Sequence, residues 1–241
     1  MVDNHAYLYY TEKETNMGST GIHVGNPNYE PITGRLGDFE NDFRQGNSNV
    51  NIEHAALFDS NGEPIIGYVG ERHSVAVDNR ALNTPGATLS HFHPDKGFGG
   101  TLSMADLKLF SKSQLGELRA VSKQGQLYSI KAGQNADRQG LAKWLKRVEP
   151  IAKKNFNNSY EKAFKTVTTP LKSGPHKGEV KITDPKTGKS VYRQPMTPVQ
   201  ARNFARQYSV GMFDRMYSKN LSKFGVTYTA TKGGYATKAK K

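Results

Sequence analysis

A strand, a proline, a loop and a capped helix follow one another between residues 87 and 110. Apolar residues predict a strand over 87–92, and Pro94 ends its hydrogen-bonding pattern because proline cannot donate to a neighbouring strand. A loop with three glycines follows, and apolar residues at helical spacing then fill 102–110. A strand followed so closely by an amphipathic helix has to bury one face of each element. We therefore expect an α+β fold.

The segments on either side predict further strands and, later, long helices. Short β-branched and apolar segments predict strands over 50–58, 65–69, 75–77, 118–121 and 127–131. Asn61-Gly62 lies between the first two of these, which is typical of a tight β-hairpin. Apolar residues at helical spacing predict a helix over 137–164, which Pro150 must kink or restart, and a second helix over 199–224.

Three regions of the chain differ in composition. Residues 1–48 are rich in glycine, asparagine and aspartate and have few apolar runs, so we expect an irregular N-terminal arm. Residues 49–135 hold most of the predicted strands and are expected to form the main domain. Residues 136–241 are expected to form a basic, mainly helical extension with a hairpin over 180–192 and a mobile C-terminal tail.

The positive charge of the chain is concentrated in its second part. Residues 137–241 carry 23 lysines and arginines against 6 aspartates and glutamates. The rest of the chain carries 11 basic and 15 acidic residues, although the whole chain has a net charge of +13. Such a surface favours nucleic acid or an acidic protein surface as a partner, whereas a solvated basic surface would explain the charge without any partner.

Two histidines and an aspartate are the residues that point most directly to chemistry. His91 and His93 are two positions apart on a predicted strand, so their imidazoles point to the same side. Asp106 falls in the first turn of the next helix, where the helix dipole favours a carboxylate. The chain has no cysteine, so a metal must be held by histidine and carboxylate. Two histidines and one aspartate leave the fourth position of a tetrahedral zinc ion for water, which is typical of catalytic sites.

These residues resemble the JAMM signature of the JAB/MPN metalloenzyme family, which is an upstream glutamate, His-x-His-Pro and Ser-x-x-Asp. The chain supplies His91-Phe92-His93-Pro94 and Ser103-Met104-Ala105-Asp106. The hairpin before the histidines is similar to that of RadC-like and phage-borne members, and the resemblance covers roughly residues 50–132. It implies a JAB/MPN-like fold, which is a mixed sheet with flanking helices, and a zinc hydrolase of peptide or isopeptide bonds. In that family the two histidines and the aspartate hold Zn²⁺, and the serine stabilises the oxyanion.

The upstream glutamate of the signature is best matched by Glu53, which lies within the predicted strand 50–58. The resemblance implies that Glu53 takes a proton from the water and passes it to the leaving amine. Glu63 and Glu71 are alternatives for this position. Both lie in turn-like segments rather than in the middle of a strand, so Glu53 is the better candidate.

Each part of the signature also has an ordinary structural explanation. Ser103 and Asp106 by themselves make a capping box, and the two histidines by themselves could be satisfied core or surface residues. Nine residues separate His93 from Ser103, where the family usually has seven, and the extra length coincides with glycines. Two alternative hypotheses follow. One is a non-enzymatic phage assembly or virion protein with a degenerate site, and the other is a nucleic-acid-binding protein that uses residues 137–241.

No segment of the sequence has the apolar length that crosses a bilayer, and residues 1–16 lack the pattern of a secretory signal. We therefore expect a soluble protein with a protein or peptide substrate and no membrane partner. The expected location is the cytoplasm of a bacterial host or a virion.

Overall fold

The computed structural model describes residues 21–32, 34–45, 51–94, 101–122, 125–183 and 188–231. The chain divides into two compact units, one made of Met1–Pro150 with Asp214–Lys241 and the other of Ile151–Phe213. The second unit is therefore an insertion within the sequence of the first. Helices and a mixed sheet together confirm the α+β class. Within the described residues, no helix is both long and apolar enough to be a candidate membrane span.

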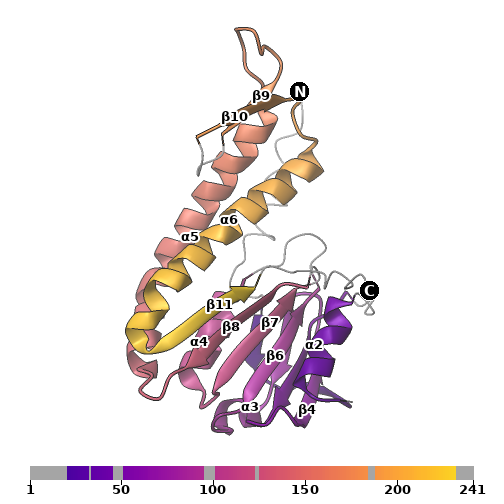
Figure 1. Cartoon of the computed structure of the whole chain (residues 1–241), viewed down its shortest axis with the longest axis vertical. Helices are drawn as coiled ribbons and strands as arrows, with labels where there is room; N and C mark the ends of the chain where they lie inside the picture. Colours follow the sequence, from indigo (N-terminus) through magenta and orange to yellow (C-terminus); the bar gives the residue numbers. More distant parts are fainter. Residues whose placement is uncertain are drawn as a thin grey trace, which may run out of the picture. The chain divides into compact units, whose positions relative to one another are not determined.

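A seven-stranded mixed sheet forms the centre of the first unit (Figure 1). In spatial order its strands are β11 (Val226–Thr231), β8 (Leu127–Ala132), β7 (Glu117–Ser122), β6 (Thr88–His93), β3 (His54–Phe58), β4 (Pro64–Val69) and β2 (Asn28–Glu30). β6 and β7 run parallel, and the other neighbouring pairs are antiparallel. The sequence predicted the five strands β3, β4, β6, β7 and β8, and the structure confirms them.

A smaller sheet and three short helices also belong to the N-terminal part of this unit. The small sheet pairs β1 (Gly21–Val24) with β5 (Ser74–Val77) in parallel. The helices are α2 (Leu36–Arg44), α3 (Asn79–Asn83) and α4 (Met104–Lys112). The structure confirms β5 and α4, which the sequence predicted.

The two faces of the large sheet carry different elements. α2 packs on one face, where its Phe39 and Phe43 join a buried cluster that includes Phe58 and Phe92. Ser90 also belongs to this face, because its hydroxyl donates to Glu40 of α2 over 3.0 Å. Side chains alternate along a strand, so the residue between Ser90 and Phe92 and the residue after Phe92 point to the opposite face. Those residues are the two histidines, and α4 lies on their side of the sheet.

The expected irregular arm over residues 1–48 is not what the structure shows for its described part. Residues 21–44 contain β1, β2 and α2, and three of their few apolar side chains, Ile22, Phe39 and Phe43, are buried. A sparse apolar pattern is sufficient here because each side chain packs on a sheet built by other residues. Local composition does not reveal such a partner. Residues 1–20 lie outside the described part of the chain.

The C-terminal half is not the separate extension expected over 136–241. The helices α5 (Arg138–Thr168) and α6 (Pro198–Asn220) each begin in one unit and end in the other. After α6, the short helix η1 (Leu221–Phe224) leads to β11, which pairs with β8 at the edge of the large sheet. α5 includes Pro150 and does not restart there. The tail expected after β11 lies outside the described residues.

The second unit contains the predicted hairpin between its parts of α5 and α6. β9 (Val180–Thr183) and β10 (Ser190–Arg193) form an antiparallel pair. Within this unit, the rings of Phe156 on α5 and Phe213 on α6 have centroids 5.8 Å apart. The unit therefore has its own apolar contacts beside its hairpin.

Candidate metal centre

The strand β6 places two histidines near the middle of the large sheet. His91 pairs with Ala55 of β3 on one side and with Ala120 of β7 on the other. The small alanine side chains leave room for the imidazole, which is completely buried. His93 lies two residues further on the same face, and its side chain is 13% exposed. The strand therefore carries both rings to one place and leaves the second ring closer to solvent.

The nitrogen atoms of these rings converge with a carboxylate from α4. His91 Nε2 lies 2.8 Å from His93 Nε2 and 3.5 Å from Asp106 Oδ2, and His93 Nε2 lies 4.0 Å from Asp106 Oδ2. A tetrahedral zinc ion with bonds of about 2.0–2.1 Å separates its ligand atoms by about 3.3 Å. The three atoms therefore form a triangle of the size that one such ion requires. They are the only described group of three metal-binding side chains whose atoms come this close.

The ring of His91 is oriented by a backbone carbonyl. Its Nδ1 lies 2.7 Å from the carbonyl oxygen of Arg119, which can only accept a hydrogen bond. Nδ1 therefore carries the proton, and Nε2 presents a lone pair toward the other two side chains. A lone pair that faces His93 Nε2 at 2.8 Å requires either a shared proton or a cation. Metal-binding histidines commonly donate their second nitrogen to a carbonyl in this way.

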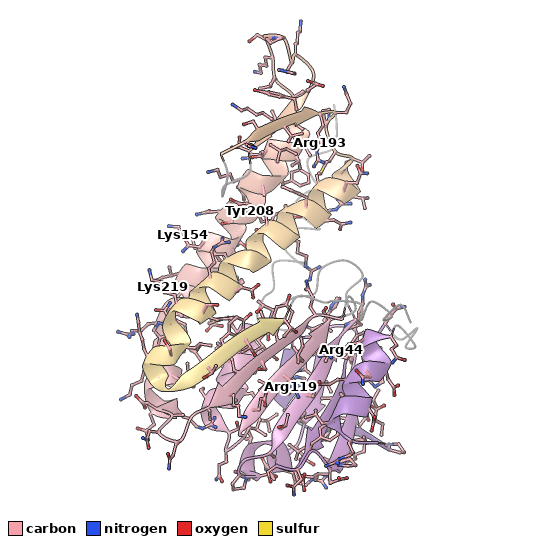
Figure 2. All side chains as sticks on the ribbon, viewed as in Figure 1. Arg44, Arg119, Lys154, Arg193, Tyr208 and Lys219 are labelled. Atoms are coloured by element: carbon pink, nitrogen blue, oxygen red, sulfur yellow. The ribbon has the colours of Figure 1, made fainter. Side chains whose placement is uncertain are left out.

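The side chain of Arg119, labelled in Figure 2, lies on the face of the sheet opposite to the histidines, because Arg119 pairs with Ser90 and both contact Glu40 of α2. Its Nε lies 3.2 Å from the Glu40 carboxylate, which also accepts from Ser90. Burial raises the pKa of Glu40 above its usual range, and the charge of Arg119 offsets part of this effect. This ion pair, whose carboxylate is buried, holds the segment of β7 whose carbonyl orients His91.

Asp106 is completely buried and accepts hydrogen bonds at both oxygens. Oδ1 accepts from the backbone N–H of Ile22 over 3.0 Å, and Oδ2 accepts from the backbone N–H of Ser103 over 2.6 Å. Burial by itself raises the pKa of Asp106, but the neighbouring His91 and His93 outweigh it and hold the pKa well below its usual range. The carboxylate is therefore ionised. A buried anion of this kind needs positive charge beside it, which a metal ion held by the two rings would supply in place of the charge of the rings themselves.

Ser103 begins α4 and forms the capping box that its sequence predicts. Its hydroxyl accepts from the Asp106 N–H over 3.1 Å while its own N–H donates to the Asp106 carboxylate. The structural explanation of Ser-x-x-Asp is therefore correct, and it operates together with the metal-site explanation. The cap fixes the side chain of Asp106 in the direction of the histidines.

Glu53 lies immediately before β3, the strand that pairs with the histidine-bearing β6. It is buried, with 4% exposure, and its backbone is anchored by hydrogen bonds to Glu71 and Gly70. Ala55 pairs with His91, and Glu53 lies two positions before Ala55 in the sequence. Glu53 does not belong to the group of three converging ligand atoms. Its position agrees with a residue beside the centre rather than a ligand.

The two alternative glutamates are both exposed to solvent. Glu63 forms an ion pair of 2.9 Å with Arg35 on the surface, and Glu71 contributes its backbone to the anchoring of Glu53. Of the three candidates, Glu53 is the one whose carboxyl group is buried near β3.

Several residues near the centre are marked by no motif. The backbones of Gly21 and Arg119 contact the site, but backbone groups leave no trace in a pattern of side chains. Tyr217 of α6 is fully buried, its hydroxyl donates to Met104 at the start of α4, and burial together with the charge of Asp106 raises its pKa. Tyr228 of β11 contacts the Thr101 hydroxyl over 2.7 Å. The C-terminal segment therefore supports the start of α4.

The described donor set fits a single divalent cation of the first transition row. Imidazole nitrogens and a carboxylate oxygen are ligands that zinc accepts, and no fourth histidine, aspartate or glutamate joins the group among the described residues. A three-ligand site keeps a coordination position for water or substrate. The glycine-rich loop that lengthens the His93–Ser103 connection lies, at 95–100, outside the described residues.

Comparison of the chain with protein-family models, with curated proteins and with solved structures gave no match.

Proposed function

We propose that the first unit is a zinc-dependent hydrolase of the JAMM type that cleaves a peptide or isopeptide bond. The observation that carries this proposal is the convergence of His91, His93 and Asp106 at a buried point of the sheet. The proposed JAB/MPN-like fold is supported by the arrangement around it. A glutamate precedes the strand that pairs with the histidine-bearing strand, and the aspartate begins the helix that follows.

The residues of the chain have separate proposed roles. His91, His93 and Asp106 would hold the metal, which lowers the pKa of a water and polarises a carbonyl when it is bound. Glu53 would accept a proton from the nucleophile and return it to the leaving amine, and it lies buried immediately before the strand that pairs with the histidine-bearing strand. Ser103 would add a hydroxyl donor for the oxyanion, since its oxygen already accepts from the Asp106 N–H and its proton remains to donate.

The test uses the full chain with and without metal. Purified protein should cleave a mixture of fluorogenic peptide and isopeptide substrates, lose this activity in a chelator and regain it with added Zn²⁺. A protein that binds zinc but cleaves none of these substrates would support the alternative of a virion or assembly protein whose site is structural. A protein that binds no divalent metal would overturn the proposal.

A second function is proposed for the second unit, which is the binding of nucleic acid through its phosphates. Residues 151–213 carry 12 lysines and arginines against 3 aspartates and glutamates. A hollow of about 740 Å³ in this unit is lined by three lysines, Lys162, Lys165 and Lys181, against one acidic residue, Glu161, and by two threonines. Lysines that converge on an open hollow suit the phosphates of a polyanion.

Further basic and aromatic side chains of the second unit lie at its surface. Figure 2 labels Lys154 on α5 and Arg193 on β10, and both are exposed. Tyr208 is 43% exposed, and its ring lies 6.5 Å from that of Phe204 at an interplanar angle of 22°. Exposed aromatic rings beside basic side chains allow the bases of a single strand to stack, so single-stranded DNA is the better first probe.

Reversal of the charge of the three lysines that line the hollow should weaken this binding. We expect the full-length triple variant Lys162→Glu, Lys165→Glu and Lys181→Glu to bind random-sequence single-stranded DNA about tenfold or more weakly at low salt. The dependence of log Kd on log salt concentration should become shallower by about 2, because each lost phosphate contact removes roughly 0.7 from the slope. Fluorescence anisotropy of a labelled oligonucleotide measures both quantities.

A matched control replaces three exposed lysines of the first unit, Lys112, Lys131 and Lys143, by glutamate. It changes the net charge by the same amount. This control should retain most of the affinity. Equal losses in the two variants would show that only net charge matters and would overturn the hollow as a site. A wild-type chain that ignores DNA at low salt would leave an acidic protein surface, or solvation alone, as the role of this charge.

A further inference from the structure

We infer that the backbone of Gly21 and Ile22 positions the aspartate ligand of the metal centre. This inference rests on the metal-binding part of the proposed function and not on hydrolysis. It concerns β1, a strand that lies outside the large sheet and more than eighty residues before Asp106 in the sequence. β1 contacts α4 directly, so its backbone reaches the start of the helix that carries Asp106.

The hydrogen bonds of β1 divide between its two edges. The N–H groups of Gly21 and Gly25 donate to the carbonyls of His73 and Val77, over 2.9 and 3.0 Å, and so face β5. Successive N–H groups of an extended chain point in opposite directions, so the N–H of Ile22 faces away from β5. That N–H donates to Asp106 Oδ1 over 3.0 Å. One edge of β1 is therefore used for a sheet and the other for the carboxylate.

The bond from Ile22 fixes how Asp106 presents its second oxygen. Oδ2 is the oxygen that lies 3.5 Å from His91 Nε2, and it is held by the Ser103 N–H. With one donor on each oxygen, the carboxylate plane cannot rotate without breaking a buried hydrogen bond. Removal of the Ile22 donor would free this rotation and leave Oδ1 buried without that bond. Metal affinity should then fall, because the ligand is no longer preorganised.

Gly21 allows β1 to come this close. A Cβ at this position would lie 2.3 Å from the Ser103 hydroxyl oxygen and 2.6 Å from Asp106 Oδ1. The Ser103 oxygen belongs to the capping box that orients Asp106, and Asp106 Oδ1 accepts from the Ile22 N–H, so neither atom can move without disturbing the ligand. The φ angle of +113° also disfavours any residue with a side chain. The absence of a side chain at residue 21 is therefore a requirement of the site itself.

The first test compares two glycines that both have positive φ. In Gly21→Ala the new methyl group meets Ser103 and Asp106, whereas in Gly86→Ala, at φ +72°, it meets nothing within 4 Å. Both variants carry a backbone penalty, but only the first disturbs the centre. We expect the Kd for Zn²⁺, measured by chelator competition, to rise about 10- to 100-fold in Gly21→Ala and less than threefold in Gly86→Ala. The visible absorption of bound Co²⁺ should change in Gly21→Ala alone.

The second test removes a hydrogen-bond donor instead of adding a methyl group. Replacement of Ile22 by its α-hydroxy acid converts the donating N–H into an ester oxygen, and the same change at Gly25 removes a β1–β5 bond of equal length. The Ile22 ester should bind Zn²⁺ about tenfold or more weakly, and the Gly25 ester should bind like wild type. The midpoint temperature of thermal unfolding, measured without metal, should fall by similar amounts in the two esters. If Gly21→Ala does not fold, the two esters still test whether the backbone of β1 positions Asp106.

The outcomes separate the inference from the proposed function. A wild-type chain that binds neither Zn²⁺ nor Co²⁺ overturns the metal centre and the inference with it. A wild-type chain that binds metal, together with an Ile22 ester that binds equally well, overturns the inference alone. Equal weakening in the Ile22 and Gly25 esters would show that β1 acts only through general stability, which also contradicts a positioning role.

Discussion

Alanine at His91 or at Asp106 should remove the metal from a protein that otherwise holds close to one zinc ion per chain. Each of the three side chains supplies one donor atom within 4.8 Å of the others, so the loss of any one leaves only two ligands. We expect the affinity to fall by more than the roughly 100-fold that the loss of an outer hydrogen-bond partner typically costs. Elemental analysis after dialysis gives the occupancy, and chelator competition gives the Kd.

A suitable control is His73→Ala, because this histidine is exposed and lies outside the converging group. It should retain the full metal content. The isosteric variant Asp106→Asn separates charge from shape, since the amide keeps the size of the side chain but not its negative charge. It should lose most of the metal while circular dichroism shows a folded protein. Full occupancy in both His91→Ala and Asp106→Ala would rule out the assignment of ligands.

Glutamine at Glu53 should keep the metal and abolish turnover. Glu53 is buried beside the centre but is not one of the three converging ligands, so the neutral amide leaves the donor set intact. A glutamine cannot take up a proton, and loss of a general base costs about 10²- to 10⁴-fold in rate. Zinc content and the rate constant for a cleaved substrate are measured on the same preparation.

The exposed glutamates provide matched controls for this change. Glu63→Gln and Glu71→Gln alter the charge equally near the same strands and should leave both zinc content and rate within about twofold, as expected for surface substitutions. Loss of zinc in Glu53→Gln would make Glu53 a ligand. An unchanged rate would assign the base to another residue and contradict the proposed role.

The strand and helix that carry the candidate ligands could be predicted because their signals are local. The apolar residues of β6, the proline after His93 and the capping box at Ser103 are each contained within a few residues. Once the two histidines lie on one face of a strand, an acidic residue in the first turn of the next helix is within reach. The histidine–aspartate group therefore required no knowledge of distant contacts.

The remainder of the centre depends on contacts that sequence patterns do not encode. The Ile22 N–H and the Arg119 carbonyl are backbone groups, which every residue possesses, so only their positions in the fold make them specific. Residues 36–44 were missed as a helix because their two phenylalanines form a stripe too short to stand out. They are stabilised by the sheet that they cover, which is a tertiary effect.

β11 shows the same limit at the other end of the chain. Its residues alternate in the manner of a strand, but the expected boundary at residue 136 placed them in a separate region. The strand finds its partner in β8, with Ser129 and Thr229 in hydrogen-bond contact although they are 100 residues apart. A pattern of side chains indicates that a segment is extended, but it does not state which edge the segment joins.

The return of β11 to the large sheet also sets the order in which the protein can mature during synthesis. The histidines and Asp106 leave the ribosome early, but the edge of β8 stays open until residue 226 has been made. Loop closure over this distance slows folding, and an open edge invites pairing with other chains. Tyr228, which contacts Thr101 just before α4, is synthesised after the whole inserted unit. A nascent chain therefore holds its ligands before it holds the packing that secures them, and the centre reaches its final form only after translation has passed the inserted unit.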